Sequence, residues 1–166
     1  MAYLFSIGAF LAWAVLVTAS DIHSRRIPNL LVVGGLVAAF ASAFYGANPF
    51  GIGRVQALFG TFVGLVGLLP FFFLGVMGAA DVKVFAVLGA WCGVQGLMWL
   101  WIAASLAAGI HALAVLLLSR TSLGTLWRRG ASASTIGRYR ATPYGACLAI
   151  PAAVWLVCLV ADGSVR

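Results

Sequence analysis

Long apolar runs separated by short polar segments dominate this 166-residue chain. A helix needs about 20 predominantly apolar residues to cross the ~30 Å hydrocarbon core of a bilayer. The pattern therefore predicts an all-α polytopic membrane protein, folded as a single domain over residues 1–166. The apolar segments span residues 3–20, 30–45, 55–74, 82–94, 97–118 and 144–160.

Glycines mark two features of these segments. The stretch from 82 to 118 would form a helix about 55 Å long, which is too much for one span. Its natural break is Gly93-Val94-Gln95-Gly96, and the short segment before this break is either a short span or a re-entrant loop. In the third segment, Gly60 and Gly64 have the four-residue spacing that allows another helix to approach closely.

The distribution of basic residues favours six spans. Six spans would leave only Arg54 and Arg166 on one side of the membrane, and the positive-inside rule assigns the richer side to the cytoplasm. A re-entrant fourth segment would instead send the basic loop from Ser119 to Thr142 outside. We therefore expect six transmembrane helices and a cytoplasmic loop facing anionic lipid headgroups. The basic residues on the cytoplasmic side are Arg25, Arg26, Lys83, Arg120, Arg128, Arg129, Arg138 and Arg140.

Composition narrows the classes further. Hydrophobic residues make up 64% of the chain and charged residues 8%, which excludes a soluble domain with a polar surface. In such a protein a net charge of +7 indicates topology and lipid contact, not nucleic-acid binding. The three cysteines include no CxxC pair, so neither a zinc site nor a disulfide framework is predicted. We interpret the first apolar run, which has no basic stretch before it, as a retained span and not a signal peptide.

Acidic residues are scarce, and their positions stand out. The chain has three aspartates and no glutamate. Asp21 and Asp81 lie at ends of apolar runs on the predicted cytoplasmic side, whereas Asp162 lies on the opposite side. Ionisable groups near a bilayer are costly and commonly functional. Because the fourth segment is short, we expect Asp81 to be recessed in a polar cavity within the membrane.

Each aspartate also has a purely structural interpretation. Residues 21–29 read DIHSRRIPN, in which Asp21 has arginines nearby with which it could pair in a juxtamembrane turn. Residues 77–83 read MGAADVK, in which Asp81 could serve as the N-cap of the following helix. Small residues before Asp81 would also let a substrate backbone approach its carboxylate. Spacing alone leaves both interpretations open.

Taken together, the two segments resemble those of the type IV prepilin peptidases, membrane aspartic proteases with a GxGD signature. Asp21 precedes a segment ending in Ile-Pro-Asn, and Asp81 is followed by Val-Lys, as in that family. Pro143-Tyr144-Gly145 resembles a weaker feature of the family. The sequence departs from the signature at Ala80, where the family has glycine. The chain is similar to the small members that serve tight-adherence (Flp) pilus systems.

The resemblance implies a function and its site. It implies a membrane aspartic endopeptidase in which Asp21 and Asp81 share a proton and activate water. The implied substrate is a prepilin or pseudopilin with a basic leader, a glycine before the scissile bond and an apolar helix after it. The implied location is the bacterial inner membrane, with the active site toward the cytoplasm. No cofactor and no metal are expected.

Some family features are missing, and other functions stay open. Larger members carry an inserted cytoplasmic domain with CxxC pairs and also N-methylate the product, so no methyltransferase activity is expected of this chain. The alternatives are a small proton- or cation-coupled transporter and a non-catalytic assembly factor of a pilus or secretion system. Nothing in the sequence indicates the oligomeric state.

Overall fold

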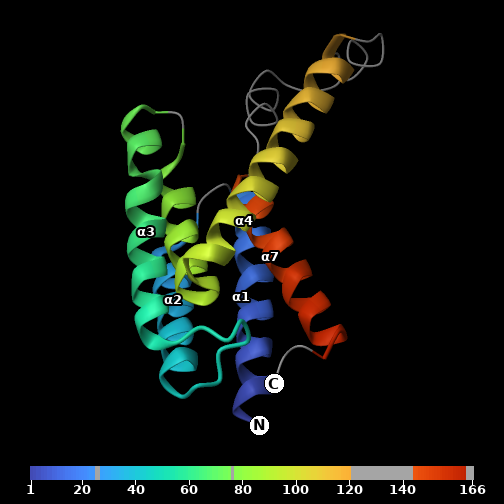
Figure 1. The fold of residues 1–166 in the computed structure, drawn as a ribbon. Coiled ribbons are helices and arrows are strands. Elements are labelled where there is room, and N and C mark those ends of the chain that lie inside the picture. The colour runs from blue at the N-terminus through green and yellow to red at the C-terminus, as the bar shows by residue number, and fades with distance from the viewer. Residues whose placement is uncertain (25–26, 76, 121–143, 164–166) are drawn as a thin grey trace.

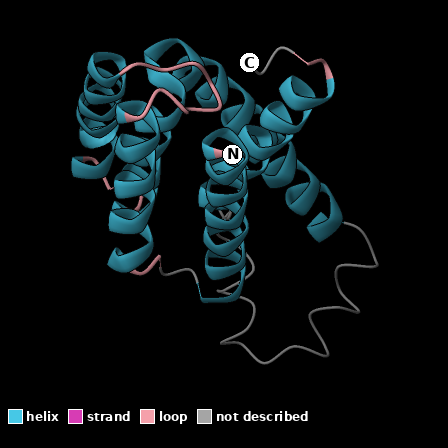
Figure 2. Ribbon diagram, turned by 90° about the horizontal axis from the view of Figure 1, so that it is seen from below, coloured by secondary structure: helices cyan, strands magenta, loops and turns pink. Residues whose placement is uncertain are grey.

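The computed structural model describes the whole chain except residues 25–26, 76, 121–143 and 164–166. Within the described residues all regular structure is helical, and Figure 2 shows helices joined by loops without a strand. This confirms the all-α prediction for that part of the chain. The helices are α1 (Ala2–Ser24), α2 (Asn29–Phe44), α3 (Arg54–Phe73), α4 (Ala79–Arg120) and α7 (Tyr144–Ala161).

Helix α4 consists of two helical halves joined at Gly93. The backbone of Gly93 has φ 66° and ψ 179°, which is not helical and which glycine adopts without the penalty that a Cβ imposes. The chain reverses direction here, so the two halves form a V (Figure 1). The break predicted at Gly93 to Gly96 is thus confirmed.

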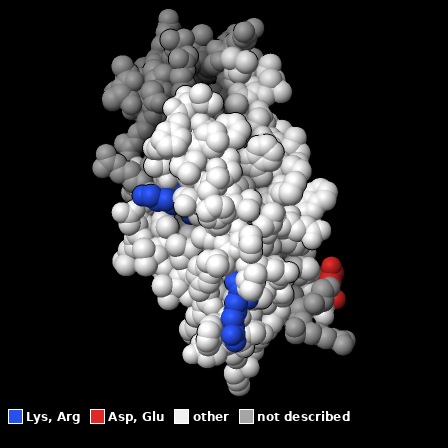
Figure 3. All heavy atoms as spheres, turned by 60° about the vertical axis from the view of Figure 1, so that its left-hand side comes forward, with Lys and Arg blue, Asp and Glu red and all other residues white. Residues whose placement is uncertain are grey.

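Several helices have the length and composition of membrane spans. Four described helical stretches qualify on both counts, and α2 is a shorter apolar helix. The surface agrees with this, because most of the described side chains on the face shown in Figure 3 are uncharged, with basic groups at two places and an acidic group at the edge. Large apolar side chains such as Phe59 and Phe62 on α3 are exposed, as suits contact with lipid. The count of six spans stays a prediction.

The first half of α4 is the buried centre of the bundle. Val84, Val87, Leu88 and Trp91 are fully buried, and the Trp91 ring packs edge-on against Phe10 of α1, with centroids 5.2 Å apart. A helix buried on all sides need not meet lipid along its length. This half can therefore be shorter than a helix that crosses the bilayer in contact with lipid. Its first turn carries Asp81.

Glycines bring α3 against this buried half. A Cβ added at Gly60 would collide with the backbone carbonyl of Gly89, and one at Gly64 would lie 2.8 Å from the carbonyl oxygen of Phe85. The close approach predicted from the Gly60 and Gly64 spacing is therefore confirmed. Because the contact is between backbones, α3 and α4 have little freedom to move relative to each other.

Candidate active site

Asp21 lies in the last turns of α1 and is buried, with 6% of its surface exposed. Its Oδ2 accepts a hydrogen bond of 2.8 Å from the backbone N–H of Ala146, in the first turn of α7. Backbone N–H groups at a helix N-terminus lack partners within the helix, and the helix dipole favours negative charge there. The start of α7 thus satisfies a carboxylate that would be costly to bury alone.

Asp81 lies in the first turn of α4. Its Oδ2 accepts a hydrogen bond of 3.3 Å from the Gly78 N–H, and its own N–H donates to the Gly78 carbonyl over 3.1 Å. Since α4 begins at Ala79, the N-cap position falls on Gly78. The interpretation of Asp81 as the N-cap is therefore wrong: its carboxylate reaches back over the helix start from within the first turn.

The two aspartates meet at the N-terminus of α7. The Asp81 carboxylate interacts electrostatically with Asp21 and also with the backbone of Gly145. Neighbouring backbone groups of α7, at Gly145 and Ala146, therefore face the two carboxylates. The Cys147 thiol, one residue further on, interacts with both carboxylates. Residues 60 positions apart in the chain are thus brought to one point by a third helix.

Gly145 can lie this close to the carboxylates because it has no side chain. An added Cβ would lie 3.0 Å from Asp21 Oδ2 and 3.2 Å from Cδ1 of Ile27. Ile27, from the Ile-Pro-Asn segment after Asp21, is itself buried. Any larger residue would press on the carboxylate. The sequence indicated Gly145 only through the family resemblance, and it gave no signal for Ala146, which acts through its backbone.

A hydrogen bond joins the two sequence segments that carry the aspartates. Lys83 Nζ donates to Oδ1 of Asn29 over 2.8 Å. Asn29 ends the segment after Asp21, and Lys83 lies two residues beyond Asp81. This contact ties the start of α2 to the start of α4. It gives both residues a structural role that spacing alone did not reveal.

The remaining residues singled out in the sequence lie as follows. Ala80, which departs from the family signature, is half-buried against the core. Asp162 is exposed after the end of α7, and Figure 1 places that end of α7 at the opposite end of the bundle from the start of α4. Arg25 and Arg26, the suggested partners of Asp21, lie outside the described residues, as do Pro143 and the basic loop from 121 onwards.

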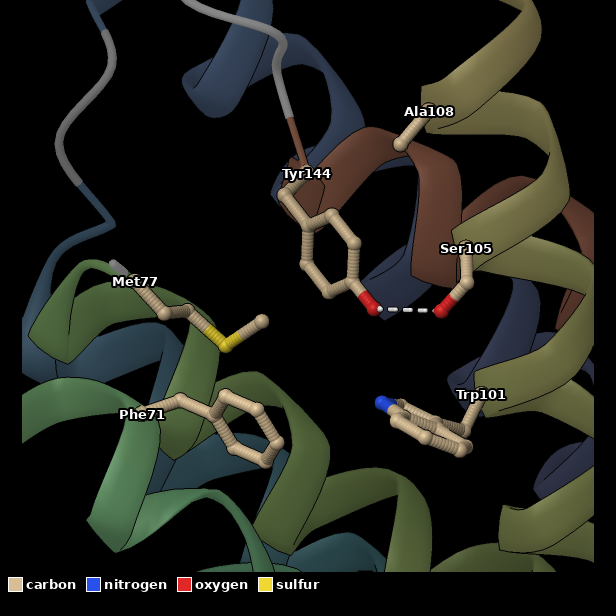
Figure 4. Close-up of a pocket in the computed structure, with 6 residues that line it drawn as sticks. All are labelled: Phe71, Met77, Trp101, Ser105, Ala108 and Tyr144. Carbon is tan, nitrogen blue, oxygen red and sulfur yellow. Dashed lines mark hydrogen bonds between the residues drawn. The ribbon is translucent and has the colours of Figure 1, made fainter. Parts of the chain in front are cut away.

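An apolar pocket of about 260 Å³ opens beside this site (Figure 4). In Figure 4 its side chains converge from α3, from the segment before α4, from the second half of α4 and from the start of α7. Two of the lining side chains make a polar contact: the hydroxyl groups of Ser105 and Tyr144 are 3.4 Å apart. The sequence had not indicated this pocket. It is lined by Phe71, Met77, Trp101, Ser105, Ala108 and Tyr144.

Among the side chains that the structure describes, no three His, Cys, Asp or Glu residues are grouped so that they could hold a metal ion. The cysteines in this part of the chain are unpaired: Cys92 is buried, Cys147 half-buried and Cys158 exposed.

The length and composition of its apolar helices define a polytopic membrane protein, and two of its aspartates lie at one helix N-terminus. Comparison with known proteins gives the family. The chain belongs to the type IV leader peptidase family, whose sequence profile matches residues 8–113. This confirms the resemblance drawn from the two aspartate segments, both of which lie within the match.

A curated relative supports the same family. The chain is 31% identical over 165 aligned positions to the prepilin leader peptidase/N-methyltransferase of Xanthomonas campestris pv. campestris. The alignment covers 90% of this chain and 48% of the relative, so the chain spans about half the length of the relative. No solved structure matches the chain.

Proposed function

We propose that this protein is a membrane aspartic endopeptidase that removes the leader from prepilins or pseudopilins. The observation that carries the proposal is the meeting of Asp21 and Asp81 at the N-terminus of α7. The family and the curated relative, which is named a prepilin leader peptidase, support the same reaction. The transporter and assembly-factor alternatives have no comparable observation in their favour.

The mechanism follows from two neighbouring carboxylates that share one proton. The ionised carboxylate takes a proton from a water molecule, whose oxygen attacks the carbonyl carbon of the scissile peptide bond. The protonated carboxylic acid then gives its proton to the departing nitrogen as the C–N bond breaks. The products are a new carboxyl group on the leader and a free amine on the mature chain. The shared proton belongs to the pair, and neither role is assigned to one aspartate.

Backbone groups at the starts of α4 and α7 would keep this pair in position. Ala146 holds one oxygen of Asp21, and Gly78 and Gly145 interact with Asp81. When a hydrogen bond fixes one oxygen of a carboxylate, the second oxygen also points in a defined direction. The carboxylates then need little rearrangement when water and a peptide bond bind. The side chains of Asp21 on α1 and Asp81 on α4 would thus be pre-oriented by hydrogen bonds that no substrate has to form.

The proposed setting is the bacterial inner membrane, with six spans and the paired aspartates toward the cytoplasm. Its support is the excess of basic residues on the predicted cytoplasmic side. The substrate would bring a basic leader, a glycine that permits an unwound backbone at the scissile bond, and an apolar helix lying in the bilayer. Its helix and the bundle would then share the same hydrocarbon layer.

Replacing each aspartate by asparagine tests the proposal. Asparagine is nearly isosteric but cannot act as a base or exchange the shared proton, so Asp21→Asn and Asp81→Asn should each reduce prepilin cleavage by about 10²–10⁴-fold. Asp162→Asn, which alters the exposed aspartate after α7, is the matched control and should cleave normally. The measurement is the rate of leader removal by variants present at equal levels in membranes. Substantial cleavage by either site variant would refute the paired-aspartate mechanism.

A further inference from the structure

The apolar pocket of Figure 4 is connected to the aspartates by the chain itself. Tyr144 lines the pocket, and the next residue, Gly145, contacts the carboxylates. Met77 lines the opposite wall, and the next residue, Gly78, donates its N–H to Asp81. Consecutive Cα atoms are about 3.8 Å apart. A group bound in the pocket would therefore lie within a residue or two of the paired carboxylates.

The size of the pocket restricts what it can hold. At about 260 Å³ it falls below the ~300–1,000 Å³ of typical small-molecule sites. A whole helix, about 10 Å across with its side chains, does not fit. The space suits one or two side chains of a longer chain that runs past the opening.

The lining determines the chemistry of the occupant. Phe71, Trp101 and Tyr144 contribute aromatic rings, and Met77 contributes a polarisable thioether, groups that pack well against aromatic and large aliphatic side chains. None of the lining residues is charged, so a buried lysine or arginine would find no ionic partner among them. The basic leader is thereby a poor match for this pocket.

We propose that the pocket binds an apolar side chain of the substrate on the mature side of the scissile bond. This inference rests on the proposed function. In the proposed substrate the leader is basic and the residue before the scissile bond is glycine, so the large apolar side chains near the bond would belong to the mature segment. Seating one of them beside Tyr144 would hold the peptide bond in register with Asp21 and Asp81. The pocket is then a specificity-determining subsite.

The hydroxyl contact between Ser105 and Tyr144 gives this subsite a fixed wall. It joins the second half of α4 to the first residue of α7, the helix whose next two residues face the carboxylates. A side chain bound against Tyr144 would therefore lie next to the residues of α7 that face Asp21 and Asp81.

Filling the pocket tests the proposal. Ala108 is a small lining residue, and Ala108→Phe should lower kcat/KM for a prepilin by about 10–200-fold, the range for misfitting groups in an apolar subsite. The matched control is Gly109→Phe, because Gly109 lies on the same turn, faces open space and does not line the pocket. It should cleave like the wild type. A substrate whose first mature residues are alanine should lose this difference between the two variants.

A binding experiment gives a readout independent of catalysis. Asp81→Asn protein would be mixed with a prepilin peptide that carries a photoactivatable leucine analogue among its first mature residues. Cross-links mapped by mass spectrometry to Trp101, Ser105 or Tyr144 support the subsite. Cross-links confined to other surfaces overturn it, as does wild-type kinetics in Ala108→Phe. Failure of the wild-type protein to cleave any prepilin would instead overturn the proposed function.

Discussion

At the scale of single residues, the site depends on backbone groups as much as on side chains. Asp21 and Asp81 are the proposed catalytic side chains, and the groups that hold them are the amides of residues 78, 145 and 146. Hydrogen bonds from N–H groups to a charged acceptor are among the stronger ones in proteins. A single methyl group at the wrong place is therefore expected to disturb the site.

Gly145→Ala puts that methyl group against Asp21. The added Cβ would lie 3.0 Å from Oδ2, so the carboxylate or α7 must shift, and a misplacement of about 1 Å can cost about 10²-fold in rate. We expect cleavage to fall by that order. The comparison is Gly8→Ala on α1, where an added Cβ meets nothing within 4 Å and cleavage should be unchanged. Equal rates for the two variants would show that Gly145 does not constrain the catalytic geometry.

The sequence singled out the two aspartates but not the backbone groups that contact them. The two aspartates stood out because a chain with so few acids keeps them in recognisable segments. The amide of Ala146 could not be found in this way, because any residue other than proline offers the same N–H. Nor did spacing reveal the hydrogen bond from Lys83 to Asn29, which depends on how α2 and α4 pack.

At the scale of helices, the glycines in the sequence predicted both the break in α4 and its close contact with α3. The break in α4 was foreseen because a glycine cluster interrupts a run too long for one span, and Gly93 is indeed the non-helical residue. The crossing of α3 and α4 was foreseen from Gly60 and Gly64. What the pattern did not reveal is that the first half of α4 is enclosed by other helices, because a uniformly apolar segment looks the same whether lipid or protein surrounds it.

The crossing gives a stability prediction. In Gly60→Ala the new methyl group would collide with the Gly89 carbonyl, and such overpacking typically costs about 1–3 kcal/mol. Gly67→Ala is the same change on the same helix at a position with open space, where alanine favours the helix by about 0.5–1 kcal/mol. Thermal unfolding in detergent should therefore separate the two, with Gly60→Ala less stable than the wild type. Similar stability for both would mean that the backbones can move apart freely.

At the scale of the whole molecule, the open question is how the bundle sits in the membrane. The six-span prediction requires residues 121–143, outside the described part of the chain, to lie in the cytoplasm. A cysteine at Ser132 should then react with an impermeant thiol reagent only from the cytoplasmic face, in a background where the exposed Cys158 is changed to serine. Asp162→Cys should react only from the other face. Labelling of both positions from one side would contradict the six-span topology.

The composition of the whole chain also predicts its reaction products. The larger family members that also methylate carry CxxC pairs, and this chain contains none. Its proposed chemistry needs only water. Purified protein in lipid or detergent should process a prepilin in the presence of EDTA. Mass spectrometry should show a mature product that begins after the leader glycine with a free amine. A methylated amine formed by this chain alone, or loss of cleavage on chelation, would contradict this prediction.

The position of the carboxylate-binding amides on α7 also affects how the protein is made. Translation produces α1 and the first half of α4, with both aspartates, well before residues 145 and 146 leave the ribosome. A nascent chain that ends between Asp81 and α7 carries both acids but lacks the amides of residues 145 and 146. The proposed protease would thus stay inactive through most of its own synthesis, and hydrolytic competence would coincide with insertion of α7 into the bilayer.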